Sequence, residues 1–398
     1  MEEVTERNKT EVEHRENIEE EQTRLHEDTD TKAKGPRLVL VRGPVFDFCS
    51  AAVTVIISFG VVLNYLVLSD RVKLKDVPFA SKREEPAYAL DHQRAFSFPN
   101  AEISSHFDGG NARSVTQDAP YEFEVKAGGE PGNGLRRWFY FSVSGIQQPV
   151  TISFSVSNIS LDVNLLKNGL VPVFKSESSG KIWSRLEDVT RIRQVDTNEL
   201  EVEFSYQYDP ASDGTIFFAM AYPWSYRSNQ LFYGTIEKTY HDHQRVLFQR
   251  HKITTTSQGN RLDAILLSSK AHIDSSKKVN YGSVQFPTVG FEKKFVAITA
   301  RMHGFESVSS LALKHIVKYL LTENPLSMDL MDNYFFVIIP MLNPDGVKLG
   351  LNLFDSSKND IDNSFPMANA NVSSECVEIK KLFADLRATG RLTVVLTL

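Results

Sequence analysis

The pattern of apolar residues changes near Tyr226, and that change limits what the chain can fold into. From about Phe96 to Trp224, short runs alternate apolar and polar residues, as in Ile152-Ser153-Phe154-Ser155-Val156, with Gly, Asp, Asn and Pro between the runs. A period of two with such punctuation is typical of the strands of an antiparallel sandwich. We therefore predict a β-sandwich domain over residues 96–228.

After Tyr226, short apolar runs alternate with a longer helical pattern. The predicted strands cover residues 246–248, 264–267, 295–299 and 335–339, and the predicted helix covers residues 309–321, ended by Asn324-Pro325. Strands that alternate with helices indicate an α/β domain. We predict this second domain over residues 229–398.

The segment before the sandwich has a different composition. Residues 1–44 are charged and almost free of aromatic residues, so we expect a disordered tail. From Phe48 to Leu68 no residue is charged, and an α-helix of that length spans about 30 Å of hydrocarbon. We predict a transmembrane anchor over residues 45–69, retained as an uncleaved signal anchor, and a linker over residues 70–95. A buried core helix is the alternative.

Charge and cysteine content restrict the partners and the compartment. The net charge of -6 without a large basic block excludes nucleic acid as a partner. Cys49 and Cys376 lie in contexts too different for a structural disulfide. Basic residues flank the uncharged run on both sides and leave its orientation open. The sequons at Asn8, Asn158 and Asn371 would report that orientation if they were glycosylated.

A candidate metal-binding pair follows the predicted strand 295–299. His303 and Glu306 are three residues apart, so an imidazole nitrogen and a carboxylate oxygen can converge on one Zn²⁺. Sites of open α/β sheets form beyond the carboxyl ends of the strands, where this pair lies. On spacing alone, an exposed helix start explains the pair better than a metal site does, because a glutamate in the first turn is stabilised by the helix dipole.

A second loop, Asn343-Pro344-Asp345-Gly346, follows the predicted strand 335–339, and each of its residues suits a tight turn. In this order and at this separation, the two motifs closely resemble the zinc metallocarboxypeptidase family, the carboxypeptidase A-like enzymes, and in particular its cytosolic carboxypeptidase branch. Segments upstream also resemble signatures of that branch, namely residues 106–111, 137–141 and 221–226. The resemblance covers about residues 97–398.

The resemblance implies a mixed-sheet catalytic domain that binds zinc. His303 and Glu306 would be the first two ligands of a Zn²⁺ that holds a water and polarises the scissile carbonyl. The family's third ligand is a histidine just after a later strand, which residues 391–398 resemble, and its general-base glutamate lies further on. The domain is therefore expected to be C-terminally incomplete, without its third ligand and base, and no catalytic residue is assigned. His315 is expected to be a surface or packing residue.

The chain departs from the family at the substrate clamp. The family's Asn-Arg pair, whose arginine binds the substrate's terminal carboxylate, corresponds here to Asp362 and Asn363. An acid and an amide cannot replace this clamp, and Asp362 would repel a carboxylate. A polar surface loop over residues 360–366 explains the segment equally well. Leu349 and Leu353 stand near the places of further arginines of the branch.

Three functions remain open at this point. The resemblance implies a membrane-tethered zinc carboxypeptidase that removes C-terminal residues, glutamates among them, from peptides or proteins such as tubulin. The substitutions at Asp362 and Asn363 instead favour a catalytically inactive relative that binds a partner. A membrane protein whose soluble region is a scaffold is the third alternative. The uncharged run predicts a single-pass membrane protein. The cytosolic branch and the scarce cysteines favour a cytoplasmic location for its soluble domain.

Overall fold

The computed structural model describes residues 93–129, 136–161, 163–178, 182–187, 189–196, 199–364 and 374–398. They all belong to one compact unit, residues 40–398. The predicted tail, the predicted anchor and the sequons at Asn8 and Asn371 lie outside the described residues. The sequon residue Asn158 is described, and its amide nitrogen donates to Ala127 O at 2.7 Å.

The predicted transmembrane helix requires a correction to the fold class. Within the described ranges, no helix is long and apolar enough to cross a membrane. The helices α4 (Tyr226–Tyr240) and α9 (Ser374–Ala388) have 15 residues each. A rise of about 1.5 Å per residue makes such helices roughly 22 Å long, short of the hydrocarbon core. The fold class is therefore corrected to a mixed α/β fold with sheets, and the structure does not support the predicted transmembrane helix.

Two sheets form the first part of the described chain, which we call the sandwich (β1 to β11). The sheets have the strand orders β1-β2-β5-β11-β7-β8 and β3-β4-β6-β10-β9. All neighbouring pairs are antiparallel, as predicted, except β4 with β6, which is parallel. The elements are β1 (Ala95–Phe98), β2 (Ala101–Ser104), β3 (Ser114–Ala119), β4 (Glu122–Lys126), β5 (Tyr140–Ser144), β6 (Val150–Ile159), α3 (Val163–Lys167), β7 (Val173–Ser176), β8 (Ser184–Arg185), β9 (Val189–Asp196), β10 (Glu199–Tyr208) and β11 (Ile216–Ala219).

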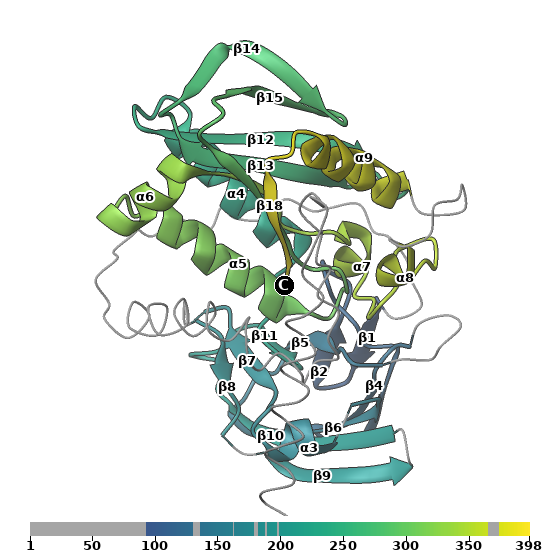
Figure 1. Ribbon diagram of the computed structural model, residues 1–398. Helices are drawn as coiled ribbons and strands as arrows, with labels where there is room; N and C mark the ends of the chain where they lie inside the picture. Colours follow the sequence, from purple (N-terminus) through teal and green to yellow (C-terminus); the bar gives the residue numbers. More distant parts are fainter. Residues whose placement is uncertain are drawn as a thin grey trace, which may run out of the picture. The chain divides into compact units, whose positions relative to one another are not determined.

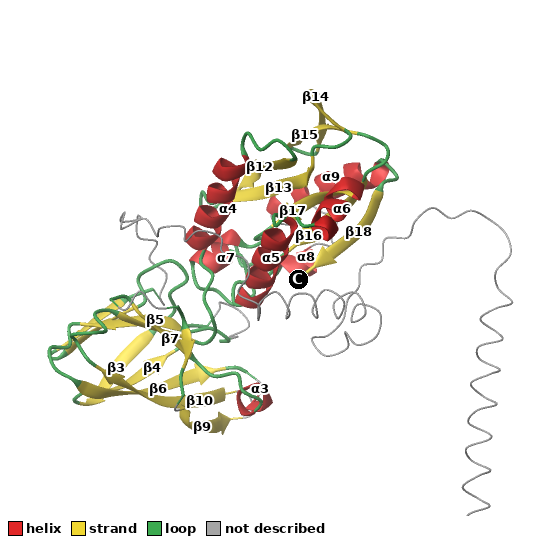
Figure 2. Ribbon diagram, turned by 90° about the vertical axis from the view of Figure 1, so that its left-hand side faces the viewer, coloured by secondary structure: helices red, strands yellow, loops and turns green. Residues whose placement is uncertain are grey.

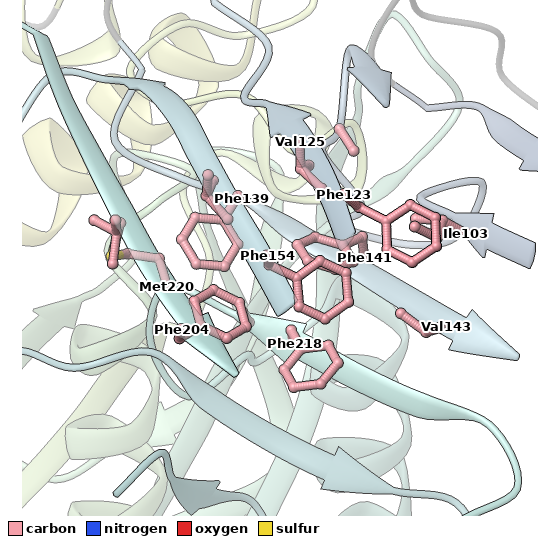
Figure 3. Packing of buried hydrophobic residues seen from close by; sticks show 14 of the residues in the cluster. Ile103, Phe123, Val125, Phe139, Phe141, Val143, Phe154, Phe204, Phe218 and Met220 are labelled. Atoms are coloured by element: carbon pink, nitrogen blue, oxygen red, sulfur yellow. The ribbon is translucent and has the colours of Figure 1, made fainter. Parts of the chain in front are cut away.

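Aromatic rings fill the space between these two sheets (Figure 3). Phe154 of one sheet lies 5.2 Å from Phe141 and 5.1 Å from Phe218 of the other, measured between ring centroids. Phe204 lies 5.5 Å from Phe218. Such tilted pairs are favourable beyond the apolar area that they bury. The alternating positions that predicted the strands are thus the positions that build this core.

A mixed sheet forms the second part, which we call the α/β region (α4 to β18). Its strand order is β12-β13-β17-β16-β18, and β16 pairs in parallel with both β17 and β18. The pairs β12–β13 and β13–β17 are antiparallel. The predicted strands and the predicted helix are confirmed within these elements. The elements are β12 (Val246–Thr255), β13 (Arg261–Ser269), β14 (Ile273–Tyr281), β15 (Val284–Val289), β16 (Lys294–Thr299), α5 (Ser307–Leu320), α6 (Pro325–Asn333), β17 (Tyr334–Ile339), α7 (Pro344–Lys348), α8 (Ile361–Ser364) and β18 (Leu392–Thr397), besides α4 and α9.

The central strand β17 of the mixed sheet is buried on both faces. Alternate residues of β17 enter two different cores: Phe335 and Val337 pack with α9 and β15, whereas Phe336 and Ile338 pack with α4, α5 and α6. Figure 1 shows α5 on one side of the sheet and α9 on the other, and Figure 2 shows the contrast with the sandwich, which is built almost entirely of strands. Burial on both faces explains why β17 reads as a continuous apolar run.

Lys293, the residue before β16, is fully buried among polar atoms. Its Nζ donates to Ser268 Oγ, to the carbonyl and hydroxyl oxygens of Ser269 and to Met331 O, at 2.6–3.1 Å. Burial lowers the pKa of this amine to about 8, against the charge of Asp332, which raises it.

This buried amine predicts a rise in stability at alkaline pH. Between about pH 8 and pH 10.4 the unfolded lysine keeps its proton while the folded one releases it, so the free energy of unfolding should increase by up to about 3 kcal/mol. Below that window both states are protonated and the burial penalty is present in full. Urea denaturation across the window would measure the rise, and Lys293→Met should flatten it. Parallel profiles for the two proteins would contradict the prediction.

Candidate metal centre

The carboxyl ends of β16 and β17 lie side by side, and the loops that follow them carry the two sequence motifs. Backbone hydrogen bonds continue between the strands' extensions: Ala300 N donates to Ile339 O, Leu342 N donates to Ala300 O, and Asn343 N donates to Arg301 O. The parallel pairing of the sheet therefore extends into the loops. It brings the His303 loop against the Asn343 loop.

His303 and Glu306 converge as their spacing predicts. His303 Nδ1 lies 2.8 Å from Glu306 Oε1, and the two side chains keep 18% and 30% of their exposure. The other imidazole nitrogen, Nε2, faces Asp360 Oδ1 at 3.8 Å. One nitrogen thus points at a carboxylate that can share a metal with it, and the opposite nitrogen points at a second carboxylate.

A tight backbone path places His303. Arg301 adopts a φ of 60°, which is uncommon for a residue other than glycine, and its buried guanidinium folds back on the loop. Its Nε and Nη2 donate to Gly304 O at 3.1 and 2.7 Å. A Cβ atom on Gly304 would overlap the carbonyl oxygens of Leu351 and Gly346, so only glycine permits this approach of the two loops.

The Asn343 loop holds the segment that carries Asp360. Asn343 Oδ1 accepts from Gly346 N at 2.8 Å and begins α7, while its Nδ2 donates to Phe354 O at 2.9 Å. Phe354 in turn pairs with Asp360 in an isolated antiparallel bridge. The asparagine therefore connects the start of α7 to the residue that faces His303.

The Asp345 side chain holds the same loop in place through hydrogen bonds. Its carboxylate is buried and accepts from Thr256 Oγ1 at 2.5 Å, from Asn260 Nδ2 at 2.7 Å and from Ser356 Oγ at 2.6 Å. Thr256 and Asn260 belong to the turn between β12 and β13, and Ser356 lies in the segment between α7 and α8 that also contains Asp360. One carboxylate thus ties three stretches of the α/β region together.

The charges around His303 are negative. Burial alone lowers the pKa of His303, but the hydrogen bond and charge of Glu306 and the charges of Asp360 and Asp362 outweigh it, so the pKa is raised. Such an environment stabilises positive charge at the imidazole. A cation between His303 and Glu306 would benefit from the same field.

These residues fit two positions of a zinc site. Neutral imidazole and carboxylate are zinc ligands, and catalytic zinc usually has three ligands from the protein. No group of three His, Cys, Asp or Glu side chains that could hold a metal ion is found among the residues that the structure describes. Among the described residues, His303 and Glu306 can therefore fill two ligand positions, and a third position has no candidate in such a group.

The other residues that were singled out from the sequence lie on the helices α8 and α5. Asp362 is exposed on α8, and its backbone N donates to Asp360 Oδ1 at 3.0 Å. Asn363 belongs to α8, and its side chain is outside what the structure describes. His315 is half-buried within α5. Sequence reasoning missed Asp360, which was grouped with a polar loop.

Comparison with known proteins finds matches to both parts of the described chain. The zinc carboxypeptidase family model matches residues 235–386, and the model of the cytosolic carboxypeptidase N-terminal domain matches residues 103–220. Cytosolic carboxypeptidase 1 of Mus musculus is 25% identical over 311 residues, which cover 74% of this chain and 25% of the relative. Cytosolic carboxypeptidase 6 of Mus musculus is 29% identical over 248 residues, which cover 61% of this chain and 42% of the relative.

A solved structure shares the fold. The crystal structure of a metallo-carboxypeptidase from Burkholderia cenocepacia has a TM-score of 0.55 at 18% identity, covering 72% of this chain and 67% of that chain. The present chain spans only 25% and 42% of the two mouse relatives. The relatives are named cytosolic carboxypeptidases and no described helix could cross a membrane, so the single-pass membrane location predicted from the sequence is wrong. The chain therefore contains a zinc carboxypeptidase domain, matched over residues 235–386, and a cytosolic carboxypeptidase N-terminal domain, matched over residues 103–220.

Proposed function

We propose that this chain supplies part of the zinc centre of a metallocarboxypeptidase that releases C-terminal residues from peptides or proteins. The observation that carries the proposal is the 2.8 Å approach of His303 Nδ1 to Glu306 Oε1 at the carboxyl end of β16. Asp360, behind the other imidazole nitrogen, would fix the ring orientation and raise its basicity as a ligand. Zinc held there would act as a Lewis acid and activate a water.

The substrate is proposed from the family and from the charges near the site. Protein C-termini that end in glutamate, such as tubulin tails, are candidate substrates in this branch. Asp362 stands where the family's clamp is expected, is exposed, and adds to the negative potential at His303. Its charge disfavours a substrate carboxylate at that place, so a clamp for the terminal carboxylate would require another cationic group.

A second candidate function is a catalytically inactive carboxypeptidase-like protein that binds a partner. The observation that favours it is the same acidic Asp362, together with a metal-ligand set that comprises two residues within the described part of the chain. Zinc would then have a structural role, or none. The two candidates differ in turnover and share the fold.

Zinc content and turnover of the full-length protein separate the candidates. We expect one zinc per chain and a release of C-terminal residues that stops when a chelator removes the metal. Peptides ending in Glu, Lys or Phe would define the preference, and the same peptides with an amidated C-terminus, which lack the terminal carboxylate, are the matched control. One bound zinc without release would favour the inactive binding protein. A protein that binds no zinc would contradict the proposal.

A further inference from the structure

The sandwich reaches the metal-binding loop through Asn352. Arg137 N, just before β5 of the sandwich, donates to Asn352 Oδ1 at 2.6 Å. The carbonyl oxygen of Asn352 accepts from Phe305 N at 3.3 Å. Asn352 keeps only 1% of its exposure, and its hydrogen bond with Arg137 N is partly buried. One residue therefore connects the backbone of the sandwich to the residue that lies between His303 and Glu306.

The side chain of Phe305 makes a second connection. It packs against the apolar core of the sandwich, and the guanidinium carbon of Arg137 lies 5.3 Å from its ring centroid. The ring is also nearly parallel to the His303 imidazole, with an interplanar angle of 17° and centroids 6.3 Å apart. The ring of Phe305 is thus a neighbour of both a sandwich cation and the proposed ligand.

Close backbone packing keeps this junction rigid. Gly109 N donates to Lys348 O at 2.9 Å, and Asn111 Nδ2 donates to Gly350 O at 3.0 Å. A Cβ atom on Gly350 would overlap the carbonyl oxygen of Gly110. Main chain meets main chain here, which leaves little freedom for the loop that carries Asn352.

We propose that Asn352 and Phe305 are positioning residues through which the sandwich holds His303 and Glu306 in metal-binding geometry. This inference rests on the proposed function, since the geometry that is held is that of the zinc half-site. Ligands have to be kept within about 0.5 Å of their productive positions by the residues that support them. The sandwich is then a part of the metal centre, because it supplies that support.

Zinc affinity of the full-length protein, measured by competition with a chromophoric chelator, tests the proposal. Asn352→Ala and Phe305→Ala should each weaken zinc affinity by about tenfold or more. Tenfold is the lower end of the loss that follows when a residue that orients a metal ligand is removed. Phe305→Tyr keeps the ring and should stay within about threefold of the unaltered protein. Because both positions act on one loop, the double variant should lose less than the product of the single losses.

A matched control separates positioning from general weakening of the junction. Gln93 Nε2 also donates across it, to Lys348 O at 3.0 Å, and its other acceptors are Phe107 O and Gly110 O. Gln93→Ala should lower the melting temperature and leave zinc affinity within about threefold. The absorption bands of Co²⁺ at saturation add a readout of ligand geometry. They should shift in Asn352→Ala and Phe305→Ala and stay in place in Gln93→Ala.

The outcomes distinguish this inference from the proposed function. If His303→Ala loses zinc while Asn352→Ala and Phe305→Ala bind with unaltered affinity and spectra, the positioning role is overturned and the proposed function stands. If His303→Ala keeps its zinc, the proposed function fails first. Should Asn352→Ala not fold, Phe305→Ala decides, because it leaves the hydrogen bonds of the junction in place. An unaltered affinity in that variant overturns the inference.

Discussion

Replacing His303 with alanine is expected to abolish stoichiometric zinc binding by the full-length protein. The change removes the nitrogen that lies 2.8 Å from Glu306 Oε1 and leaves that carboxylate without its partner ligand. Loss of a residue that merely orients a ligand costs about 10–100-fold in affinity, so loss of the ligand itself should exceed about 100-fold. Metal analysis after gel filtration, with chelator competition for the residual affinity, would measure it.

Two variants control this prediction. Asp360→Asn keeps the size of the side chain but removes the charge that faces His303 Nε2, and a loss of about 10–100-fold is expected. His315→Ala removes a half-buried histidine from α5 and should keep one zinc per chain. Stoichiometric zinc in His303→Ala would refute the assignment of the half-site.

Replacing Asp345 with alanine is expected to lower the free energy of unfolding by roughly 3–5 kcal/mol. The carboxylate is the acceptor for Thr256 Oγ1, Asn260 Nδ2 and Ser356 Oγ, all at 2.5–2.7 Å. Hydrogen bonds to a charged group are the stronger kind, and buried donors that lose their acceptor keep their full desolvation cost. Chemical denaturation followed by far-ultraviolet circular dichroism would measure the loss.

The comparison with Asp355 isolates the reason for that loss. Asp355 is also buried, and within the described part of the chain its carboxylate accepts only from Ser357 and Asn359 in its own loop. Asp355→Ala should therefore lower the free energy of unfolding by less than Asp345→Ala does, because the Asp345 carboxylate joins three separate stretches of the chain. A change below about 1 kcal/mol in Asp345→Ala would show that the network is not needed for stability.

Apolar periodicity was sufficient to predict the most continuous of the buried strands. β17 consists almost wholly of buried apolar residues and was predicted over residues 335–339. β14 was not predicted, because its central residues are exposed and polar and give no apolar period. The parallel pairing of β4 with β6 was also beyond sequence reasoning, because alternation along a strand carries no information on the direction of its neighbour.

The site was predictable only where its members are close in sequence. His303 and Glu306 are three residues apart and converge because of that local spacing. Asp360 and Asn352 reach them through the loop that follows α7, whose path depends on Asn343, Asp345 and the contact with the sandwich. A single sequence contains no measure of such long-range placement, so two of the residues that surround the half-site remained hidden. The roles of Asp362 and Asn363 stay predictions.

The contact of Gly350 with the backbone of Gly110 has a consequence for descent. Neither main chain can move apart from the other without opening the junction, and neither position can gain a side chain. A recombination event that exchanged the sandwich for another module would need to bring a matching loop with it. Any variation on one side of the contact has to be followed by variation on the other. Exchange of either part alone is therefore expected to disrupt the junction.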